Sequence, residues 1–277
     1  MLTPRLDAPE GEDFLSGTSG QVWGIRATSR ALARDARDDA LALLTALPLR
    51  LRRAAARWPA RRVLALGVVR EDQPSILEEA FAELGRSRHE VEAVARATGG
   101  RGKWENIDGL LAEHPAAGHD WLLVIDDDVR LPRGFLDAFV FLAERFGLRI
   151  AQPAHRARSH AAWRVTRRQP GVVARRTAFV ESGPVVGFQA ATFGTLLPFP
   201  RLRAGWGIDH HWSALARERG WPIGILDAIP VRHGLRRIAA AYDRGEAIAE
   251  GREFLATRPH TRSAEAQRTL ARYRGWN

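Results

Sequence analysis

The chain has 277 residues, 45% of them apolar, so it is long enough to bury a core and too apolar to be wholly disordered. It contains no cysteine, which excludes disulfides and thiolate metal sites. Its net charge is +10, but Lys103 is the only lysine and the arginines are spread along the chain. The charge therefore favours anionic partners in general, and we do not expect a nucleic-acid partner.

The N-terminus and the apolar runs favour a cytoplasmic location. Met1 to Gly20 carries acidic residues and no apolar core, so it does not resemble a signal peptide. No run approaches the roughly 20 apolar residues that a membrane span needs.

Residues 1–60 are predicted to be a polar lead-in followed by a helical extension. From about Ser29 to Leu47, apolar residues such as Leu32 and Leu43 recur at helical spacing, and residues 49–58 form a short, strongly basic continuation. Two interpretations remain open. The extension is either a cap packed on the main domain or, through residues 28–60, a peripheral contact with the inner face of the membrane.

Apolar runs alternate with helical patterns from residue 61 onward. Residues 63–69 and 121–125 are continuous apolar runs, typical of strands buried on both faces. Further strands are predicted at 89–95, 148–151, 185–188, 223–226 and 229–231. Helices are predicted at 75–85, 103–113, 132–147, 209–219, 242–256 and 264–273. This alternation predicts an α/β, Rossmann-like fold with a mostly parallel sheet flanked by helices.

One long segment lacks clear periodicity. Residues 154–176 are predicted as a loop rich in arginine, at positions 164, 167, 168, 175 and 176. These arginines either lie solvated at the surface or form a mobile lid over a diphosphate.

Three carboxylates, Asp126, Asp127 and Asp128, directly follow the strand at 121–125. Ligands bind beyond the carboxyl ends of strands in open α/β sheets, and residues two apart in an extended chain point the same way. A Mg²⁺ or Mn²⁺ ion would relieve the repulsion between these anions and bridge to a diphosphate. The alternative is an acidic turn near the N-terminus of the helix that follows Pro132.

The segment from Asp120 to Asp128 resembles the Asp-x-Asp strand of GT-A-fold glycosyltransferases. Other short motifs occur around it in a fixed order: Lys103-Trp-Glu-Asn106, Ile150-Ala-Gln-Pro153, Gly205-Trp-Gly-Ile-Asp209 and Val231-Arg-His233. This order is similar to a little-characterised plant and bacterial family of GT-A-like glycosyltransferases. The resemblance covers about residues 61–260, which it implies to be a catalytic domain. It leaves 1–60 as an N-terminal extension and 261–277 as a C-terminal helical tail.

The resemblance implies a nucleotide-sugar donor and a divalent metal, Mn²⁺ or Mg²⁺. Asp126 is implied on the sugar side of the donor and Asp128 on the metal, with Asp127 able to replace either. His233 is implied to complete the metal shell, and its imidazole suits Mn²⁺ better than Mg²⁺.

The resemblance also implies donor contacts at the end of the first strand and around the only lysine. Arg70, Glu71 and Asp72 stand where GT-A enzymes contact the nucleotide, and Lys103 and Asn106 resemble donor-contacting positions. Solvated loop charges are the alternative for the first three.

The acceptor side is predicted at the Gly-Trp-Gly turn. Trp206 offers a flat ring on which a sugar can stack, and Asp209 can take the proton of the attacking hydroxyl as general base. A base predicts inversion at the anomeric carbon, whereas a mechanism without one permits retention. The alternative interpretation is a core tryptophan and a helix-capping aspartate.

We therefore expect a metal-dependent glycosyltransferase whose acceptor, a glycan, lipid or small molecule, is left open. Two rivals remain: a metal-dependent phosphoryl-transfer enzyme using the same aspartates, and a non-catalytic, basic polyanion-binding protein on a degenerate transferase scaffold.

Overall fold

The structure is a computed structural model, and it describes residues 12–235 and 243–276. The described helices are α1 (Ile25–Leu44), α2 (Leu47–Ala55), α3 (Leu77–Leu84), α4 (Lys103–Glu113), α5 (Phe135–Arg145), α6 (Phe193–Leu196), α7 (Ile208–Glu218), α8 (Arg244–Leu255) and α9 (Ser263–Ala266). The described strands are β1 (Arg62–Val69), β2 (Glu90–Ala97), β3 (Trp121–Asp126), β4 (Val129–Arg130), β5 (Ile150–His155), β6 (Ala174–Thr177), β7 (Val185–Gln189), β8 (Ile223–His233) and β9 (Thr269–Tyr273). The predicted helical start at Tyr242 lies outside the described residues.

A single mixed sheet forms the centre, in the order β2-β1-β3-β7-β5-β8-β6-β9, with β4 paired to the end of β8. β1 is parallel to β2 and β3, and β5 is parallel to β8. β7 is antiparallel to both β3 and β5, and β6 is antiparallel to both β8 and β9. Strands β1, β2, β3, β5, β8 and β9 therefore run in one direction, which confirms the predicted α/β fold with a mostly parallel sheet.

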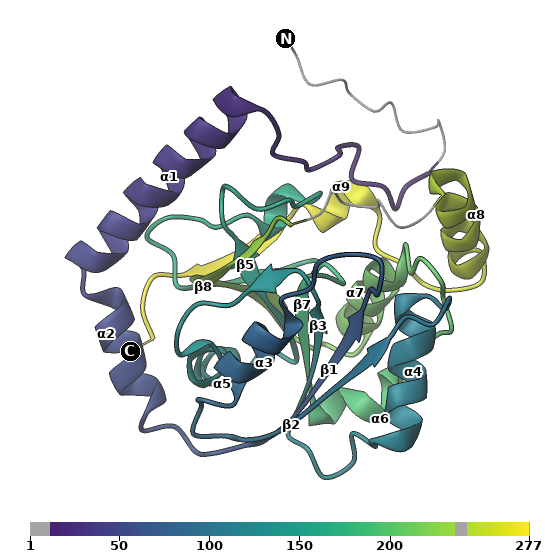
Figure 1. Cartoon of the computed structure of the whole chain (residues 1–277), viewed down its shortest axis with the longest axis horizontal. Coiled ribbons are helices and arrows are strands. Elements are labelled where there is room, and N and C mark those ends of the chain that lie inside the picture. Colours follow the sequence, from purple (N-terminus) through teal and green to yellow (C-terminus); the bar gives the residue numbers. More distant parts are fainter. Residues whose placement is uncertain (1–11, 236–242, 277) are drawn as a thin grey trace.

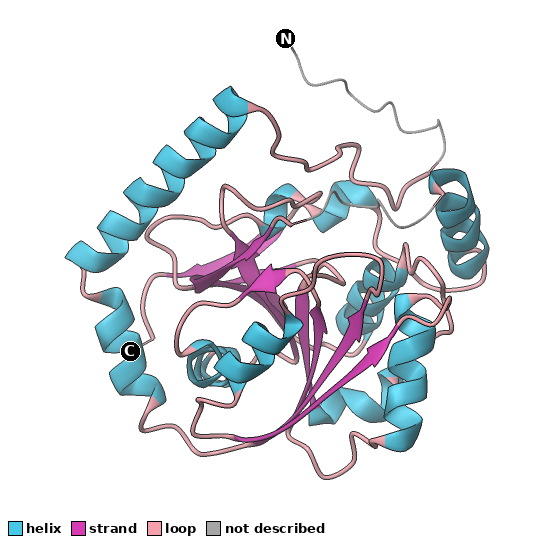
Figure 2. Cartoon of the chain, viewed as in Figure 1, coloured by secondary structure: helices cyan, strands magenta, loops and turns pink. Residues whose placement is uncertain are grey.

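Helices cover both faces of the sheet (Figures 1 and 2). Val63 of β1 packs in a core with α2, α3 and α5, including Phe139. Its neighbour Leu64 packs in a second core with α4 and α7, including Trp212. Successive side chains of a strand point to opposite faces, so the continuous apolar run of β1 supplies both cores. This sandwich fixes the position of the loops at the carboxyl edge of the sheet.

Helix α1 lies along the outer edge of the molecule (Figure 1). Its buried residues are Ala31, Asp35 and Asp38. Leu32 and Leu43, which the sequence pattern placed on a packed face, are 45% and 68% exposed. The apolar stripe therefore faces outward, and α1 contacts the main domain through other residues.

Carboxylates dock α1 onto the body of the protein. The Asp35 carboxylate accepts hydrogen bonds from the backbone nitrogens of Ala157 and Arg158, at 2.8 and 3.0 Å. Asp39 forms ion pairs with Arg156 and Arg168, which a spacing-based prediction of apolar contact cannot anticipate. Among the described helices, none is both long and apolar enough to cross a bilayer.

The segment predicted as a loop at 154–176 is more ordered than its sequence indicates. It contains the end of β5, a 3₁₀ turn at Arg164–Thr166 and the start of β6. Arg175 is fully buried and its guanidinium makes two hydrogen bonds to Asp227, at 2.8 and 3.0 Å. Arg167 donates to backbone carbonyls and Arg168 pairs with Asp39, so these three arginines hold the segment in place and do not form a lid.

Replacing Arg175 with methionine is expected to lower the free energy of unfolding by about 3–5 kcal/mol, because it leaves the buried Asp227 carboxylate without its cation. Chemical denaturation monitored by circular dichroism measures the change. The matched control is Arg176→Met, since Arg176 is the next residue of β6 and is exposed. Equal denaturation midpoints for the two variants would refute a stabilising role for the pair.

The C-terminal tail differs from the predicted helix. Only Ser263–Ala266 is helical, and Thr269–Tyr273 forms β9, which pairs with β6 at the edge of the sheet. The helical prediction for 264–273 is wrong because pairing with the otherwise open edge of β6 satisfies this backbone as a strand. In the same way, the two short strands predicted at 223–231 are one strand, β8, which continues to His233.

Candidate active site

A cleft of about 730 Å³ opens beyond the carboxyl ends of β1 and β3. Its described walls come from residues between 14 and 21, the end of β1, residues 98–104, the aspartate triplet, residues 181–183, residues 203–209 and His233. Nine of the predicted site residues line it: Arg70, Asp72, Lys103, Asp126, Asp127, Asp128, Trp206, Asp209 and His233. Glu71 and Asn106 lie outside the described lining.

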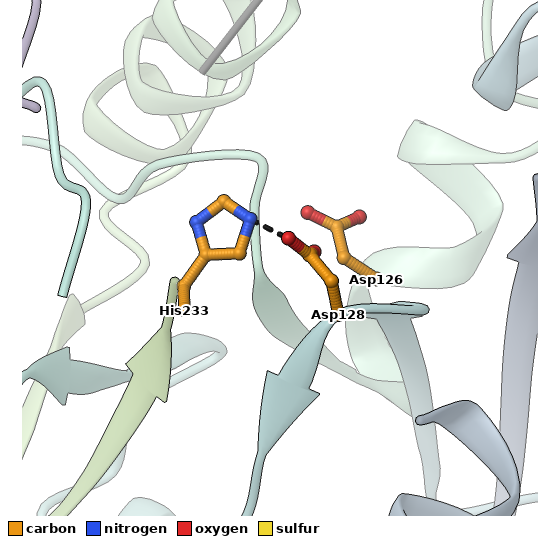
Figure 3. A group of neighbouring side chains, drawn as sticks. All are labelled: Asp126, Asp128 and His233. Carbon is orange, nitrogen blue, oxygen red and sulfur yellow. Dashed lines mark ion pairs between the residues drawn. The ribbon is translucent and has the colours of Figure 1, made fainter. Parts of the chain in front are cut away.

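Asp126, Asp128 and His233 converge at one point in the cleft (Figure 3). Asp126 ends β3, and the pairing of Val129 with His233 in the β4–β8 ladder brings Asp128 beside the imidazole. The His233 Nε2 and Asp128 Oδ1 atoms are 2.9 Å apart. One oxygen from each aspartate and one ring nitrogen of His233 lie within 4.8 Å of one another. Residues more than 100 positions apart in sequence thus form one compact group.

The donor set of this group fits a divalent cation. Carboxylate oxygens suit Mg²⁺ and Mn²⁺, and an imidazole nitrogen shifts the preference toward Mn²⁺. Burial by itself would lower the pKa of His233, but the hydrogen bond that its ring donates to Asp128 and the charges of Asp128, Asp126 and Glu181 raise it above its ordinary value. The surrounding carboxylates therefore stabilise a positive charge at this position.

Lys103 contacts the same group. Its Nζ lies 2.6 Å from Asp126 Oδ1 and 3.0 Å from the carbonyl oxygen of Ser182. The first turn of α4 carries this lysine to the cleft. Gly183 makes room for the pair, since a Cβ at that position would lie 2.7 Å from Asp126 Oδ2.

Asp127 turns toward the end of β1. Its Oδ2 atom accepts a hydrogen bond from the backbone nitrogen of Arg70 at 2.9 Å, and its carbonyl accepts one from Ile76 at 2.7 Å. Its carboxylate therefore anchors the loop after β1, apart from the group formed by Asp126, Asp128 and His233.

The residues around the first loop divide into two sets. Arg70 and Asp72 line the cleft and form an ion pair at 2.9 Å. Glu71 instead accepts a hydrogen bond from the backbone nitrogen of Gly99 at 3.4 Å. Asn106 is buried, and its Nδ2 donates to the carbonyls of Thr98 and Gly102 at 3.0 Å each. Asn106 therefore shapes the glycine-rich loop that forms one wall of the cleft.

The Gly-Trp-Gly turn forms another wall. Gly205 and Gly207 have φ values of 74° and 89°, and a Cβ at Gly205 would lie 2.2 Å from Trp104. Trp206 is half-buried: it packs against the core and also lines the cleft. Trp206 thus belongs to both the core and the cleft wall, and its role as an acceptor platform stays a prediction.

Asp209 is almost completely buried in the first turn of α7. Its Oδ1 accepts a hydrogen bond from the backbone nitrogen of His210 at 3.0 Å, and its Oδ2 accepts one from Ser182 at 3.4 Å. Burial, with the nearby charge of Glu181, raises the pKa of Asp209 to about 7. A carboxyl group with this pKa is half ionised near neutral pH, which suits proton transfer.

Glu181 lines the cleft and was missed by the sequence reasoning. It receives a hydrogen bond from Thr166 Oγ1 at 3.2 Å, and its Oε2 lies 3.3 Å from Nε2 of the buried His155. One signal was present in the sequence. The segment from Arg145 to Val180 is rich in arginine and contains no acidic residue, and Glu181 is the first acidic residue after it.

The N-terminal lead-in also borders the cleft, which the sequence did not indicate. Phe14 is buried, and residues 15–19 line the cavity. Beyond them, Gly20 accepts a hydrogen bond from the backbone nitrogen of Ala161 at 3.1 Å, and the nitrogen of Val22 donates to His160 Nδ1 at 3.0 Å. The cleft is therefore built partly from the extension that precedes β1.

Comparisons with known proteins give distant likenesses. No protein-family model and no curated protein sequence matches the chain. Among solved structures, the chain is similar to the mannosyltransferase PcManGT from Pyrobaculum calidifontis, in complex with GDP-Man and Mn²⁺, at 14% identity and a TM-score of 0.48, over 87% of this chain and 79% of that one. It is also similar to GalNAc-T7 with UDP, GalNAc and Mn²⁺, at 10% identity and a TM-score of 0.43, over 66% of this chain and 45% of that one. The predicted membership in a plant and bacterial family stays a prediction.

Proposed function

We propose that the protein is a metal-dependent glycosyltransferase of the GT-A type. The observation that carries the proposal is the convergence of Asp126, Asp128 and His233 within 4.8 Å, on the floor of a cleft at the carboxyl edge of an α/β sheet. Asp128 and His233 hold Mn²⁺ or Mg²⁺ in this proposal, and Asp126 faces both the cation and the donor. When bound, the cation supplies positive charge that neutralises a leaving nucleoside diphosphate.

The chain's own residues complete the donor site in this proposal. Lys103, which contacts Asp126, and Arg70 both line the cleft, where they can hold phosphate oxygens. Asp72 can accept a hydrogen bond from a ribose hydroxyl. Asn106 and Glu71 act indirectly, because their hydrogen bonds fix the loop at residues 98–102.

On the acceptor side, Asp209 is the proposed general base. Its raised pKa lets it accept the hydroxyl proton near neutral pH, and burial, together with the negative charge of Glu181, keeps that pKa high. Trp206 offers the acceptor a ring face in the same cleft. Deprotonation of the acceptor for in-line attack predicts inversion at the anomeric carbon. The acceptor carries a hydroxyl group and is a glycan, a lipid or a small molecule.

We also propose that the protein lies in the cytoplasm and contacts the inner face of the membrane through residues 28–60. Leu43 and Leu44 are 68% and 83% exposed, and just before this region Ile25 is 88% exposed. Helices α1 and α2 of this region also carry exposed arginines, among them Arg30 and Arg53. Exposed apolar side chains among arginines favour the interface of an anionic bilayer.

A thermal-shift panel of UDP-, GDP- and dTDP-sugars, each with and without Mn²⁺, tests the proposed function. One nucleotide is expected to raise the melting temperature only when Mn²⁺ is present, since a ligand at about 100 times its Kd stabilises by about 2.7 kcal/mol. No response to any donor, together with a shift on adding nucleic acid, would favour the polyanion-binding rival. Metal-dependent release of phosphate from a nucleotide without sugar transfer would favour phosphoryl transfer.

A further inference from the structure

A second cavity, of about 770 Å³, lies between α1 and residues 157–170. Its described lining carries five arginines: Arg30, Arg34, Arg164, Arg167 and Arg168. Two come from α1, and three come from the 3₁₀ turn and the residues that follow it. Segments more than 100 residues apart in sequence thus direct cations to one place.

The positive charge of this arginine pocket exceeds what its acidic neighbours compensate. Asp38 is the acidic residue among the described lining residues, and it already pairs with Arg37 at 2.9 Å. Arg168 is neutralised by Asp39 at 2.7 Å. Three of the remaining four, Arg30, Arg34 and Arg164, are exposed, and no ion pair within the described residues holds them.

Arg167 adds a charge that carbonyl groups orient without neutralising it. Its guanidinium donates to the backbone oxygens of Ser159 at 2.7 Å and of Arg156, Ala157, Ala161 and Gly20 at 3.2 Å each. Burial lowers the pKa of this guanidinium. Arg167 is half-buried and forms no ion pair within the described residues, although the negative charges of Glu181 and Asp35 act on it, so it adds to the positive charge of the pocket.

We propose that the arginine pocket binds a phosphate group. Guanidinium groups donate paired hydrogen bonds that match phosphate oxygens, and several of them around one cavity favour a group with more than one negative charge. The arrangement also relates the pocket to the cleft, because Gln21 and His155 line both cavities. A ligand whose phosphate occupies the pocket would therefore lie next to the cleft that Asp209 lines.

This position suggests which molecule brings the phosphate. Resting on the proposed function, we assign the pocket to a phosphate carried by the acceptor. Arg30 and Arg34 lie on α1, whose outer side exposes Leu32 and Leu43, so a phosphate at the head of a lipid would meet both the cations and the apolar stripe. A soluble phosphorylated acceptor would use the pocket alone.

The experiment uses the full chain without divalent cations or nucleotide, titrated with inorganic pyrophosphate by calorimetry. The variant R30A/R34A/R164A is expected to bind roughly tenfold more weakly or worse, because it removes charge-assisted contacts. The matched control R52A/R53A/R57A loses the same charge at exposed arginines of α2 and of the turn after it, outside the pocket, and is expected to stay within about twofold of wild type. A second variant, R30K/R34K/R164K, keeps the charge and loses the paired donors, and is expected to fall between the two.

Vesicle flotation then separates the two sources of phosphate. If a lipid carries it, wild type floats with phosphatidylcholine vesicles containing phosphatidic acid and less with vesicles containing phosphatidylserine, and the pocket variant loses this preference. If wild type binds pyrophosphate and shows no preference between the vesicles, the phosphate belongs to a soluble molecule. Both results support the site, and the first also supports membrane contact through α1.

Unchanged pyrophosphate binding by R30A/R34A/R164A, or equal weakening by the α2 control, would overturn the proposal. Its failure is separable from that of the glycosyltransferase assignment, since the titration contains neither metal nor nucleotide. A pocket that binds pyrophosphate in a chain that ignores every nucleotide sugar would retain the site and remove the assigned activity.

Discussion

Replacing Asp128 with asparagine is expected to abolish the Mn²⁺-dependent response to nucleotide and to reduce sugar transfer by about 10³-fold. The substitution keeps the size of the side chain and removes the charge that stands 2.9 Å from His233. Metal charge stabilisation is worth several kcal/mol in a transition state, and each 1.4 kcal/mol corresponds to about tenfold in rate. Isothermal titration with Mn²⁺ and a radiolabelled-sugar transfer assay measure the two losses.

Asp108→Asn is the control for this experiment. Asp108 is an aspartate of α4 that pairs with Arg201 at 2.9 Å, and it is not among the described residues that line the cleft. This variant is expected to bind Mn²⁺ and nucleotide as wild type does. If Asp128→Asn kept full Mn²⁺ affinity, Asp128 would not be a metal ligand, and the proposed function would lose its main support.

Replacing Asp209 with asparagine is expected to lower kcat by about 10²- to 10⁴-fold, the range for loss of a general base. The pKa of about 7 also predicts the pH dependence of wild type: kcat/KM rises with pH around neutrality, as the carboxyl group of Asp209 loses its proton. Initial rates between about pH 5.5 and pH 8.5 check this acid limb. A pH-independent rate, or an asparagine variant as active as wild type, would exclude Asp209 as the base.

Asp209→Asn is expected to lower activity but to raise the stability of the folded protein above neutral pH. The folded-state pKa of Asp209 lies above its unfolded value, so the folded protein binds the proton more tightly. Stability is therefore lost as pH rises from about 4 through 7, by at most about 4 kcal/mol. Asp209→Asn lacks this loss and should denature at higher urea than wild type at about pH 8, with little difference at about pH 4.

Glu218→Gln is the matched control for stability, since Glu218 lies on the same helix and is exposed. It is expected to follow the wild-type dependence on pH. Higher stability of Asp209→Asn at about pH 8, with no such change in Glu218→Gln, would show that the buried carboxylate of Asp209 destabilises the folded protein at the proposed active site.

The sequence predicts the parts of this fold that are dictated by burial. β1 and β3 are continuous apolar runs because both faces of the sheet are covered, and α4, α5 and α7 carry clear helical spacing. The aspartates at the end of β3 could be found for the same reason, since a buried strand ending in charge points to a carboxyl edge. That His233 lies beside them was predicted only through the resemblance, because its position depends on the register between β4 and β8.

The rest depends on contacts between distant segments, which local patterns do not encode. α1 faces inward through Asp35 because backbone nitrogens of residues 157 and 158 are there to receive it. β9 is a strand because β6 has a free edge. The sequence does not indicate that Arg175 is buried, because its burial depends on the ion pair with the distant Asp227. Glu181 and the lead-in at residues 14–19 reach the cleft only through the path of the folded chain.

The contact between Lys103 and Asp126 has a consequence for the protein in the absence of metal. Each carboxylate that would hold the cation already has a basic partner within the chain: the ammonium group of Lys103 for Asp126 and the imidazole of His233 for Asp128. These internal counterions offset the mutual repulsion of the aspartates, so the tip of β3 does not depend on a bound ion to keep its shape. A cation bound by Asp126 would compete with Lys103 for this carboxylate, and the ammonium group would then be able to bind an anionic substrate.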